Sequence, residues 1–436
     1  MLPTATFPDA ARAIRDVLLP VVAQGAILRR PAASRSAELL HADDHALRRV
    51  RALRDKYGEG PLLIRLPGRT IALVLDPGHV HRILHETPEP FSAATSDKVG
   101  ALNHFQPHAV LATDPPLRAP RRELNEEALD THQPVHRHAE SMTAAITEEL
   151  QLEGTFGWTD FRAVWSRIVR RIVLGDEARD DTELTDLLDV LRSNANWATL
   201  HPRNRNARQR LDRKLAEYVE HDAPGSLVDA LMLSSIKRDS RTVAPGGGLD
   251  PAGQVPHWLF AFDAAGIALW RLLAVLATRP DVAEQIAKDD SPLRAYAGGA
   301  VLESLRLWPT TLVVLREGRT ETFWDAGTAP PGTEFAIVSS VFHRDDEALD
   351  FANDFVPEVW LDGRSDGSWP LIPFSEGPAV CPGRNVVLLT TSTAAHHLTS
   401  NYDLDLDPHT RAKLTRGPLP ATFDHTAPRM GFWRKP

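Results

Sequence analysis

The residues best suited to chemistry surround Cys381, the single cysteine of the 436-residue chain. It lies in the loop PFSEGPAVCPGRN, residues 373–385, and an apolar helical pattern begins directly after it. Backbone N–H groups at a helix N-terminus and the positive end of the helix dipole stabilise a thiolate. Gly377 and Gly383 flank the cysteine and let the backbone turn tightly or let a flat ligand approach. The loop therefore predicts a thiolate that binds a ligand; the alternative is an inert cysteine of the core.

A second candidate is the pair Glu303-x-x-Arg306 in the segment ESLRLWP. In a helix, a spacing of three residues places the carboxylate and the guanidinium on one face, where they can form an ion pair. Such a pair is common on protein surfaces when it stands alone. Its position upstream of the cysteine loop favours a structural role in the core.

The two motifs together resemble the cytochrome P450 family. The cysteine loop matches the haem-ligand signature of that family at four positions: Phe374, Gly377, Cys381 and Gly383. The resemblance implies the cytochrome P450 fold, mainly α with small segregated β-sheets, in a single haem-thiolate domain over 1–436. It also implies heme b as the cofactor, with Cys381 as the axial ligand of the iron and with Glu303 and Arg306 as structural residues. An anionic, electron-rich sulfur ligand favours O–O bond cleavage.

By this resemblance, arginines are expected to hold the haem propionates. Arg122 lies in DPPLRAPRREL and Arg316 in TTLVVLREG, where the family has arginines that contact a propionate. Arg118 stands where many bacterial relatives have a histidine with the same role. Guanidinium groups bind carboxylates through charge-assisted hydrogen bonds, so all three are candidate cofactor-binding residues.

Two positions near these motifs depart from the family pattern. Ala379 stands where the family often has an arginine or histidine that reaches a propionate, and Arg118 could compensate for it. Val359 stands where an arginine usually completes a network with Glu303 and Arg306. That network is therefore expected to close differently or to stay partial.

The helix expected on the other haem face, HWLFAFDAAGIALWRLLAVLA, lacks an acid and a threonine that the family uses. Ala265 and Gly266 match the family's Ala-Gly pair, whose small side chains leave room for dioxygen and substrate. Ala268 and Leu269 stand at the acid and threonine positions, where neither side chain can relay a proton. Asp263 lies about 9 Å from Leu269 along the helix axis, too far to replace the acid.

These features leave three functions open. The first is a monooxygenase that oxidises a small organic substrate, in secondary metabolism by family analogy, with the substrate supplying the missing hydroxyl or acid. The second is a related oxidoreductase that uses peroxide or oxidises without inserting oxygen, which Ala268 and Leu269 favour. The third is a haem-binding sensor or accessory protein without turnover. Residues 87–113 and 195–205 are expected to contact the substrate.

Composition limits the class of protein. Hydrophobic residues at 42% and charged residues at 25% are typical of a soluble globular chain, and a formal net charge of −9 argues against binding to nucleic acid. One cysteine fits a reducing compartment, which favours the cytoplasm. The apolar stretches 17–28 and 259–277 contain Pro20 in the first and Asp263 and Arg271 in the second. Neither is expected to span a membrane.

Helices must position most of these residues. Apolar periodicity predicts them near 36–57, 77–86, 118–130, 135–152, 158–175, 182–197, 203–220, 225–239, 254–280, 282–289, 293–307 and 384–399. Strands are predicted as a hairpin at 62–75, at 311–318, at 333–340 and near the C-terminus. The run Gly246-Gly247-Gly248 lacks the lysine of a phosphate-binding loop and is expected to connect two helices.

Charged segments point to partners. Soluble members of the family receive electrons from a ferredoxin or flavodoxin, and Arg121 and Arg384 are candidates for docking such a donor. The segment HPRNRNARQRLDRK, residues 201–214, is rich in arginine. It is expected to be a solvated helix face or, alternatively, to bind an acidic or carrier-tethered substrate.

Histidines recur at helical spacing in three places: His41 with His45, His81 with His85, and the group His132, His136 and His138. A spacing of four residues can present two imidazoles to zinc. Because none of these pairs has the sequence context of a known zinc motif, solvated helix faces are the expectation.

Overall fold

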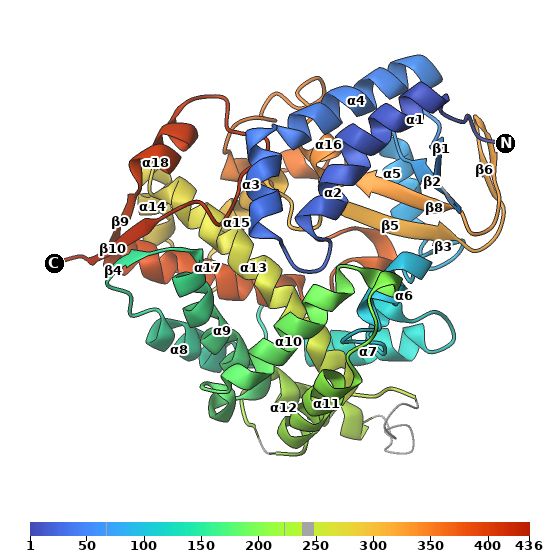
Figure 1. Ribbon diagram of the computed structural model, residues 1–436. Helices are drawn as coiled ribbons and strands as arrows, with labels where there is room; N and C mark the ends of the chain where they lie inside the picture. The colour runs from blue at the N-terminus through green and yellow to red at the C-terminus, as the bar shows by residue number, and fades with distance from the viewer. Residues whose placement is uncertain (67, 222, 238–247) are drawn as a thin grey trace. The chain divides into compact units, whose positions relative to one another are not determined.

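Helices form most of the structure, and the short strands gather in small separate sheets (Figure 1). The computed structural model describes residues 1–66, 68–221, 223–237 and 248–436. The chain divides into two compact units, each built from segments far apart in the sequence. Unit 1 contains residues 1–96, 302–381 and 416–424, and unit 2 contains residues 97–301, 382–415 and 425–436. The predicted mainly α fold with small segregated sheets is confirmed, whereas the single domain stays a prediction.

Unit 1 is built around a five-stranded sheet with the order β1-β2-β8-β5-β3. Its strands are β1 (Leu62–Leu66), β2 (Arg69–Leu73), β3 (Phe91–Ser92), β5 (Val313–Gly318) and β8 (Glu334–Val338). β1 and β2 form the predicted hairpin, and Pro67 of its turn lies outside the described residues. β2 and β8 run parallel, whereas β5 is antiparallel to both β8 and β3. β6 (Thr322–Trp324) and β7 (Gly327–Ala329) form a separate antiparallel pair.

Both faces of this sheet are buried, and alternate residues of one strand serve different clusters. Leu62 and Ile64 of β1 belong to a core cluster with Val50 and Leu53. Leu63, between them, belongs to a second cluster with Phe335 and Trp324. The near-continuous apolar sequence of β1 follows from this double burial.

The helices of unit 1 are α1 (Phe7–Ala13), η1 (Ile14–Leu18), α2 (Leu19–Gln24), α3 (Pro31–Leu39), α4 (Ala42–Tyr57), α5 (Pro77–His85) and α16 (Ser339–His343). The single helix predicted over 36–57 is wrong, because the chain breaks between α3 and α4. His41 has a φ of +48°, in the left-handed region. A non-glycine residue in that conformation leaves no clear signal in the sequence.

Unit 2 contains most of the helices: α6 (Ser96–Leu102, whose first residue is in unit 1), α7 (Arg118–Ala128), α8 (Ala139–Glu149), α9 (Trp158–Leu174), α10 (Thr182–Ala195), α11 (Arg205–Glu220), α12 (Leu227–Lys237), α13 (Val255–Leu276), α14 (Pro280–Ala287), α17 (Arg384–Asn401) and α18 (Pro408–Thr415). α15 (Ala295–Leu307) begins in unit 2 and ends in unit 1. β4 (Gly154–Phe156), β10 (Met430–Arg434) and β9 (Tyr402–Leu406) form an antiparallel sheet. These bounds agree with the helices predicted from residue 77 onward. Residues 238–239 of the helix predicted over 225–239, and Gly246 and Gly247 of the glycine run, lie outside the described residues.

α13 is the most apolar long helix. The stretch Ala252–Leu276 is long and apolar enough to cross a membrane, yet 67% of its most apolar window is buried inside the protein. Asp263 and Arg271 interrupt its apolar sequence. The burial agrees with the predicted core helix.

Candidate active site

The loop of Cys381 lies in unit 1 and is closed by backbone hydrogen bonds. The Cys381 N–H donates to the Phe374 carbonyl at 2.9 Å, and the Val380 N–H donates to the Gly377 carbonyl at 2.9 Å. A short 3₁₀ helix, η9 (Gly377–Ala379), lies between them. Cys381 is partly exposed, so it is not the inert buried cysteine of the alternative interpretation.

Gly377 sets how closely this loop approaches α5. Its φ is +66°, a left-handed conformation that glycine adopts without strain. A Cβ at this position would lie 2.4 Å from the carbonyl oxygen of Leu84 and 2.9 Å from Cα of His85. Conformation and space therefore both require glycine. A Cβ at position 383 would lie 3.8 Å from the Leu129 side chain, which is an ordinary contact. The available space therefore does not require glycine at position 383.

Arg316 of β5 reaches the cysteine loop from a buried position with 3% exposure. Its Nη2 donates to the Ser375 hydroxyl at 3.3 Å, and its Nε donates to the Thr87 hydroxyl at 3.1 Å. Nη1 donates to the Leu315 carbonyl at 3.0 Å. The guanidinium charge would stabilise a carboxylate that bound beside Arg316. Sequence reasoning did not find Thr87 or Ser375, since a hydroxyl far away in the chain carries no motif.

Arg118 and Arg122 lie one helical turn apart at the start of α7 in unit 2, and both are buried. The Arg122 Nε donates to Glu126 at 2.6 Å. The Nε of Arg118 is buried and has no hydrogen-bond partner among the described residues. Burial lowers the pKa of Arg118, and the like charge of Arg122 lowers it further. An anionic group would satisfy this orphaned donor and offset the repulsion between the two guanidiniums.

Arg121, on the same helix, is 4% exposed. Its Nη1 donates to the Thr113 hydroxyl at 2.9 Å, and its Nε donates to the Gly248 carbonyl at 3.1 Å. The prediction that Arg121 docks an electron donor is therefore wrong, because neighbouring segments cover it. Arg384, the other candidate, is exposed at the start of α17.

The residues expected opposite the thiolate lie buried on α13: Ala265, Gly266, Ala268 and Leu269. A Cβ on Gly266 would lie 2.6 Å from the Trp165 ring of α9, whose indole N–H donates to the Phe262 carbonyl at 2.7 Å. The space expected beside Gly266 is therefore filled by an indole, which corrects the role inferred for this glycine.

Asp263 of α13 is not available as a proton relay. It forms an ion pair with Arg192 of α10, and its carboxylate lies 3.6 Å from Arg162 of α9. Both guanidiniums hold the carboxylate in place through charge-assisted contacts. The expectation that Asp263 cannot replace the missing acid fits this arrangement.

Glu303 and Arg306 form a fully buried, bidentate ion pair on α15. Arg306 donates from Nη2 at 2.6 Å and from Nε at 2.8 Å to the two carboxylate oxygens. It also donates to four backbone carbonyls, those of His343, Phe351, Ala352 and Asp354.

The other donors to Glu303 are the Val356 N–H and the Trp360 indole N–H, both at 3.0 Å. Val359, where the family commonly has an arginine, is instead fully buried in an apolar cluster with Phe351. The network closes differently from the family pattern, which was one of the two expectations.

About half of the basic segment 201–214 is neutralised by acidic residues. Arg208 contacts Asp212 at 2.7 Å, Arg210 contacts Glu183, and Lys214 contacts Asp181 at 2.9 Å. Arg203, Arg205 and Arg213 are exposed. These three are the cations that can meet a partner in solution.

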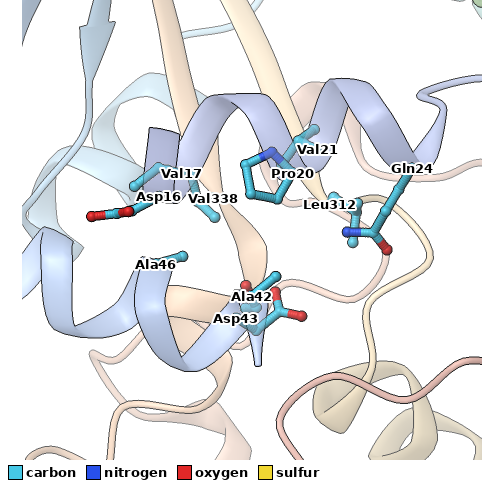
Figure 2. Close-up of a pocket in the computed structure, with 11 residues that line it drawn as sticks. Asp16, Val17, Pro20, Val21, Gln24, Ala42, Asp43, Ala46, Leu312 and Val338 are labelled. Carbon is cyan, nitrogen blue, oxygen red and sulfur yellow. The ribbon is translucent and has the colours of Figure 1, made fainter. Parts of the chain in front are cut away.

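A small pocket lies in unit 1 between the N-terminal helices and the sheet (Figure 2). Pro20, Val21 and Gln24 of α2 face Asp43 of α4 across it. Its cavity volume is about 10 Å³, room for roughly one water molecule. An organic substrate does not fit there. Phe91, in the segment expected to contact substrate, is fully buried against Phe335, so it is a core residue.

Comparison with known proteins agrees with this geometry. Residues 274–422 match the family model of cytochrome P450. The chain is 26% identical over 218 residues to cyclooctat-9-en-7-ol 5-monooxygenase of Streptomyces melanosporofaciens, which covers 46% of this chain and 47% of the relative. It is 27% identical over 138 residues to taxane 10-beta-hydroxylase of Taxus cuspidata, covering 31% and 28%. The matches thus span about half or less of these curated relatives.

The fold is similar to the crystal structure of CYP175A1 from Thermus thermophilus, with a TM-score of 0.62 and 20% identity over 84% of this chain and 90% of that one. The chain therefore has the cytochrome P450 fold. Within that fold, residues 274–422 are similar in sequence to the cytochrome P450 family.

The residues described above fit the haem that this family implies. Unit 1 offers a partly exposed cysteine and a buried guanidinium bonded to the same loop. Unit 2 offers the orphaned donor of Arg118 next to Arg122. A thiolate can ligate the haem iron, and buried cations can bind its two carboxylates.

Proposed function

We propose that this chain is a haem-thiolate oxidoreductase of the monooxygenase type, which uses heme b to oxidise a small organic substrate. The observation that carries the proposal is the loop of Cys381, where the family signature surrounds a partly exposed cysteine and Ser375 meets the buried Arg316. When bound, the haem supplies oxidation at an iron whose thiolate ligand favours O–O bond cleavage. Relatives named as a monooxygenase and a hydroxylase support this activity.

In this proposal each group of side chains has a distinct role. Cys381 would ligate the haem iron from the loop that contains Phe374, Gly377 and Gly383. Three arginines would hold the propionates: Arg118, Arg122 and Arg316. Glu303 and Arg306 hold the chain around the loop, because their buried network ties α15 to segments 343–360.

The test is the absorption difference spectrum of the reduced protein with carbon monoxide, beside Cys381→Ala. We expect the red-shifted Soret band of a thiolate-ligated haem in the native protein and its loss in the variant. A histidine-type band in fresh native protein, or no haem uptake, would reject the proposal and favour a sensor or accessory protein without turnover.

A second candidate is an enzyme that uses peroxide or oxidises without inserting oxygen. The buried Ala268 and Leu269 of α13 favour it, together with the ion pairs that hold Asp263. The side chains of Ala268 and Leu269 cannot relay a proton. Turnover with hydrogen peroxide alone, compared with NAD(P)H and redox proteins, separates the candidates. Product formed only with the redox proteins would support the monooxygenase and place the proton source on the substrate.

We also propose that electrons come from a ferredoxin or flavodoxin in the cytoplasm, and that the substrate belongs to secondary metabolism.

The exposed Arg203, Arg205 and Arg213 suit an acidic or carrier-tethered substrate. The double substitution Arg205→Glu with Arg213→Glu tests this, with Arg208→Glu as a control because Arg208 is already paired with Asp212. Only the double variant should raise KM at low salt. An unchanged KM in the double variant would contradict the proposal that an acidic substrate binds at these arginines.

A further inference from the structure

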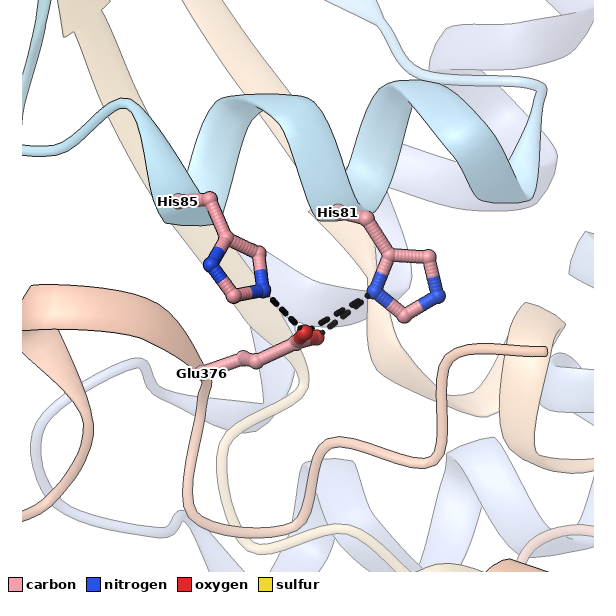
Figure 3. Close-up of side chains that lie close together, drawn as sticks. All are labelled: His81, His85 and Glu376. Carbon is pink, nitrogen blue, oxygen red and sulfur yellow. Dashed lines mark hydrogen bonds and ion pairs between the residues drawn. The ribbon is translucent and has the colours of Figure 1, made fainter. Parts of the chain in front are cut away.

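Two histidines of α5 and one glutamate of the cysteine loop meet in unit 1 (Figure 3). His81 Nδ1 lies 2.8 Å from Glu376 Oε2, and His85 Nε2 lies 2.5 Å from Glu376 Oε1. One potential ligand atom from each of the three residues lies within 4.8 Å of the others. The spacing of four residues put both imidazoles on one helix face, as the sequence suggested. His85 is exposed, as expected of a solvated face, but His81 is half-buried and Glu376 contacts both imidazoles.

The hydrogen bonds of His81 decide which of its nitrogens can bind a cation. Its Nε2 lies 2.8 Å from the Ser368 carbonyl, which can only accept, so Nε2 carries the hydrogen. In the neutral ring, Nδ1 then directs a lone pair at the carboxylate of Glu376, which is also an acceptor. A cation, either a proton or a metal ion, must therefore lie between them. A histidine that donates its second N–H to a backbone carbonyl is typical of metal-ligating histidines.

The scaffold holds these groups in place before any ion arrives. Glu376 directly precedes Gly377, whose missing Cβ lets the loop backbone contact Leu84 and His85. α5 is itself capped, since the His79 N–H donates to the Asp76 side chain at 3.1 Å. The three ligands thus come from a capped helix and a loop packed directly against it, which reduces the ordering that binding would require.

We propose that His81, His85 and Glu376 form a binding site for a divalent transition-metal ion, with Zn²⁺ as the expected occupant. Two imidazoles and one carboxylate are a known zinc ligand set, with water as the fourth ligand. Bonds of about 2.0–2.1 Å in a tetrahedral site separate ligand atoms by about 3.3 Å. The observed contacts of 2.5 and 2.8 Å need to open by less than 1 Å to admit the ion. Ca²⁺ and Mg²⁺ are disfavoured because they prefer oxygen ligands.

The bound ion would join α5 to the loop that carries Cys381, five residues after Glu376. Its role would be to clamp this loop. The proposal does not depend on haem binding or turnover, because it rests only on the contacts among His81, His85 and Glu376.

The experiment is calorimetric titration of ZnCl₂ into the tag-free holoprotein after metal chelation. We expect the native protein to bind one zinc ion tightly, and we expect the zinc affinity to fall at least tenfold in His85→Ala and in Glu376→Gln. Removing even an outer-shell partner of a metal site costs about 10–100-fold. His45→Ala is the matched control, since His41 and His45 form an exposed pair at the same spacing. This control should leave the affinity for the tightly bound zinc ion unchanged.

Zinc K-edge X-ray absorption gives a second measurement, because the haem iron absorbs at a different edge. The native protein should show a shell of nitrogen and oxygen ligands with two imidazoles, and zinc should raise its melting temperature but not that of His85→Ala. Tight binding that survives both substitutions, or no tight binding by a folded native protein, would overturn the proposal. In the latter case the cluster is a hydrogen-bonded ion pair only.

Discussion

The indole N–H of Trp360 donates a 3.0 Å hydrogen bond to Oε2 of Glu303. It stands one residue after Val359, where the family pattern has an arginine, and it supplies a neutral donor to the same buried carboxylate. The Glu303–Arg306 pair is therefore completed by an indole and backbone groups instead of a second guanidinium. A neutral donor avoids burying another charge.

Trp360→Phe removes this donor and keeps the ring in place. We expect the free energy of unfolding to fall by about 1.5–3 kcal/mol, the usual contribution of a hydrogen bond to a charged group. Urea denaturation measures the change. Trp433→Phe, at a half-exposed indole of β10, is the control and should change stability far less. Equal effects of the two substitutions would show that the Glu303 contact contributes nothing.

Gly377→Ala combines a strained backbone with a collision against Leu84. We expect about 1–2 kcal/mol from the left-handed conformation and a further 1–3 kcal/mol from the collision. Gly332→Ala measures the conformational strain without the collision, because Gly332 has a φ of +80° and a Cβ added there would meet nothing within 4 Å. In carbon monoxide spectra, only Gly377→Ala should lose part of the thiolate-type band. An intact band would show that the loop adapts to the extra carbon.

Arg118→Gln tests the buried donor that lacks a partner among the described residues. If it binds a propionate, its loss should speed haem transfer to apomyoglobin by about 10–100-fold, the equivalent of one charge-assisted hydrogen bond. The control is Arg205→Gln, at an exposed position of α11. Without a propionate contact, Arg118→Gln should instead relieve the repulsion with Arg122 and raise stability without changing haem transfer.

His343 makes stability depend on pH. It is fully buried on α16, its Nε2 accepts from the Ile372 N–H at 3.0 Å, and burial with the nearby Arg306 charge lowers its pKa to about 3. The unfolded chain titrates this histidine near pH 6.5 and therefore binds the proton first on acidification. The stability contribution is complete well above pH 6.5 and is lost as the pH falls toward 3, by about 2 kcal/mol between pH 7 and 5.

The measurement is urea denaturation at several pH values between 7 and 5. His343→Gln should flatten the pH dependence, whereas His132→Gln, at an exposed histidine, should not. Identical slopes in His343→Gln and the native protein would contradict the assignment.

Local patterns predicted most of the longer helices and the β1–β2 hairpin, because periodic burial leaves a periodic sequence. They missed the break between α3 and α4 and the short helices α6, α16 and α18. They also located Cys381, Glu303 and Arg306, whose spacing is itself the signal. Contacts between distant segments were not predictable: the Ser375 hydroxyl on Arg316, the Trp360 indole on Glu303, and Glu376 against His81. Each joins residues that no period or motif connects. For the same reason, the sequence did not reveal that Arg121 is buried, because Thr113 and Gly248, which contact its guanidinium, lie outside its helix. The prediction that Arg121 docks an electron donor was therefore wrong.

The contact between Gly266 and Trp165 limits how this protein can be altered, in evolution or in the laboratory. Residue 266 is an obvious position to vary when a new substrate range is sought, because it lies in the helix expected beside the substrate. Any larger residue there would first meet the indole 2.6 Å from its Cβ. Libraries that diversify residue 266 alone should return mostly poorly folded variants, and viable changes should arise together with a smaller residue at 165. We expect the two positions to change together.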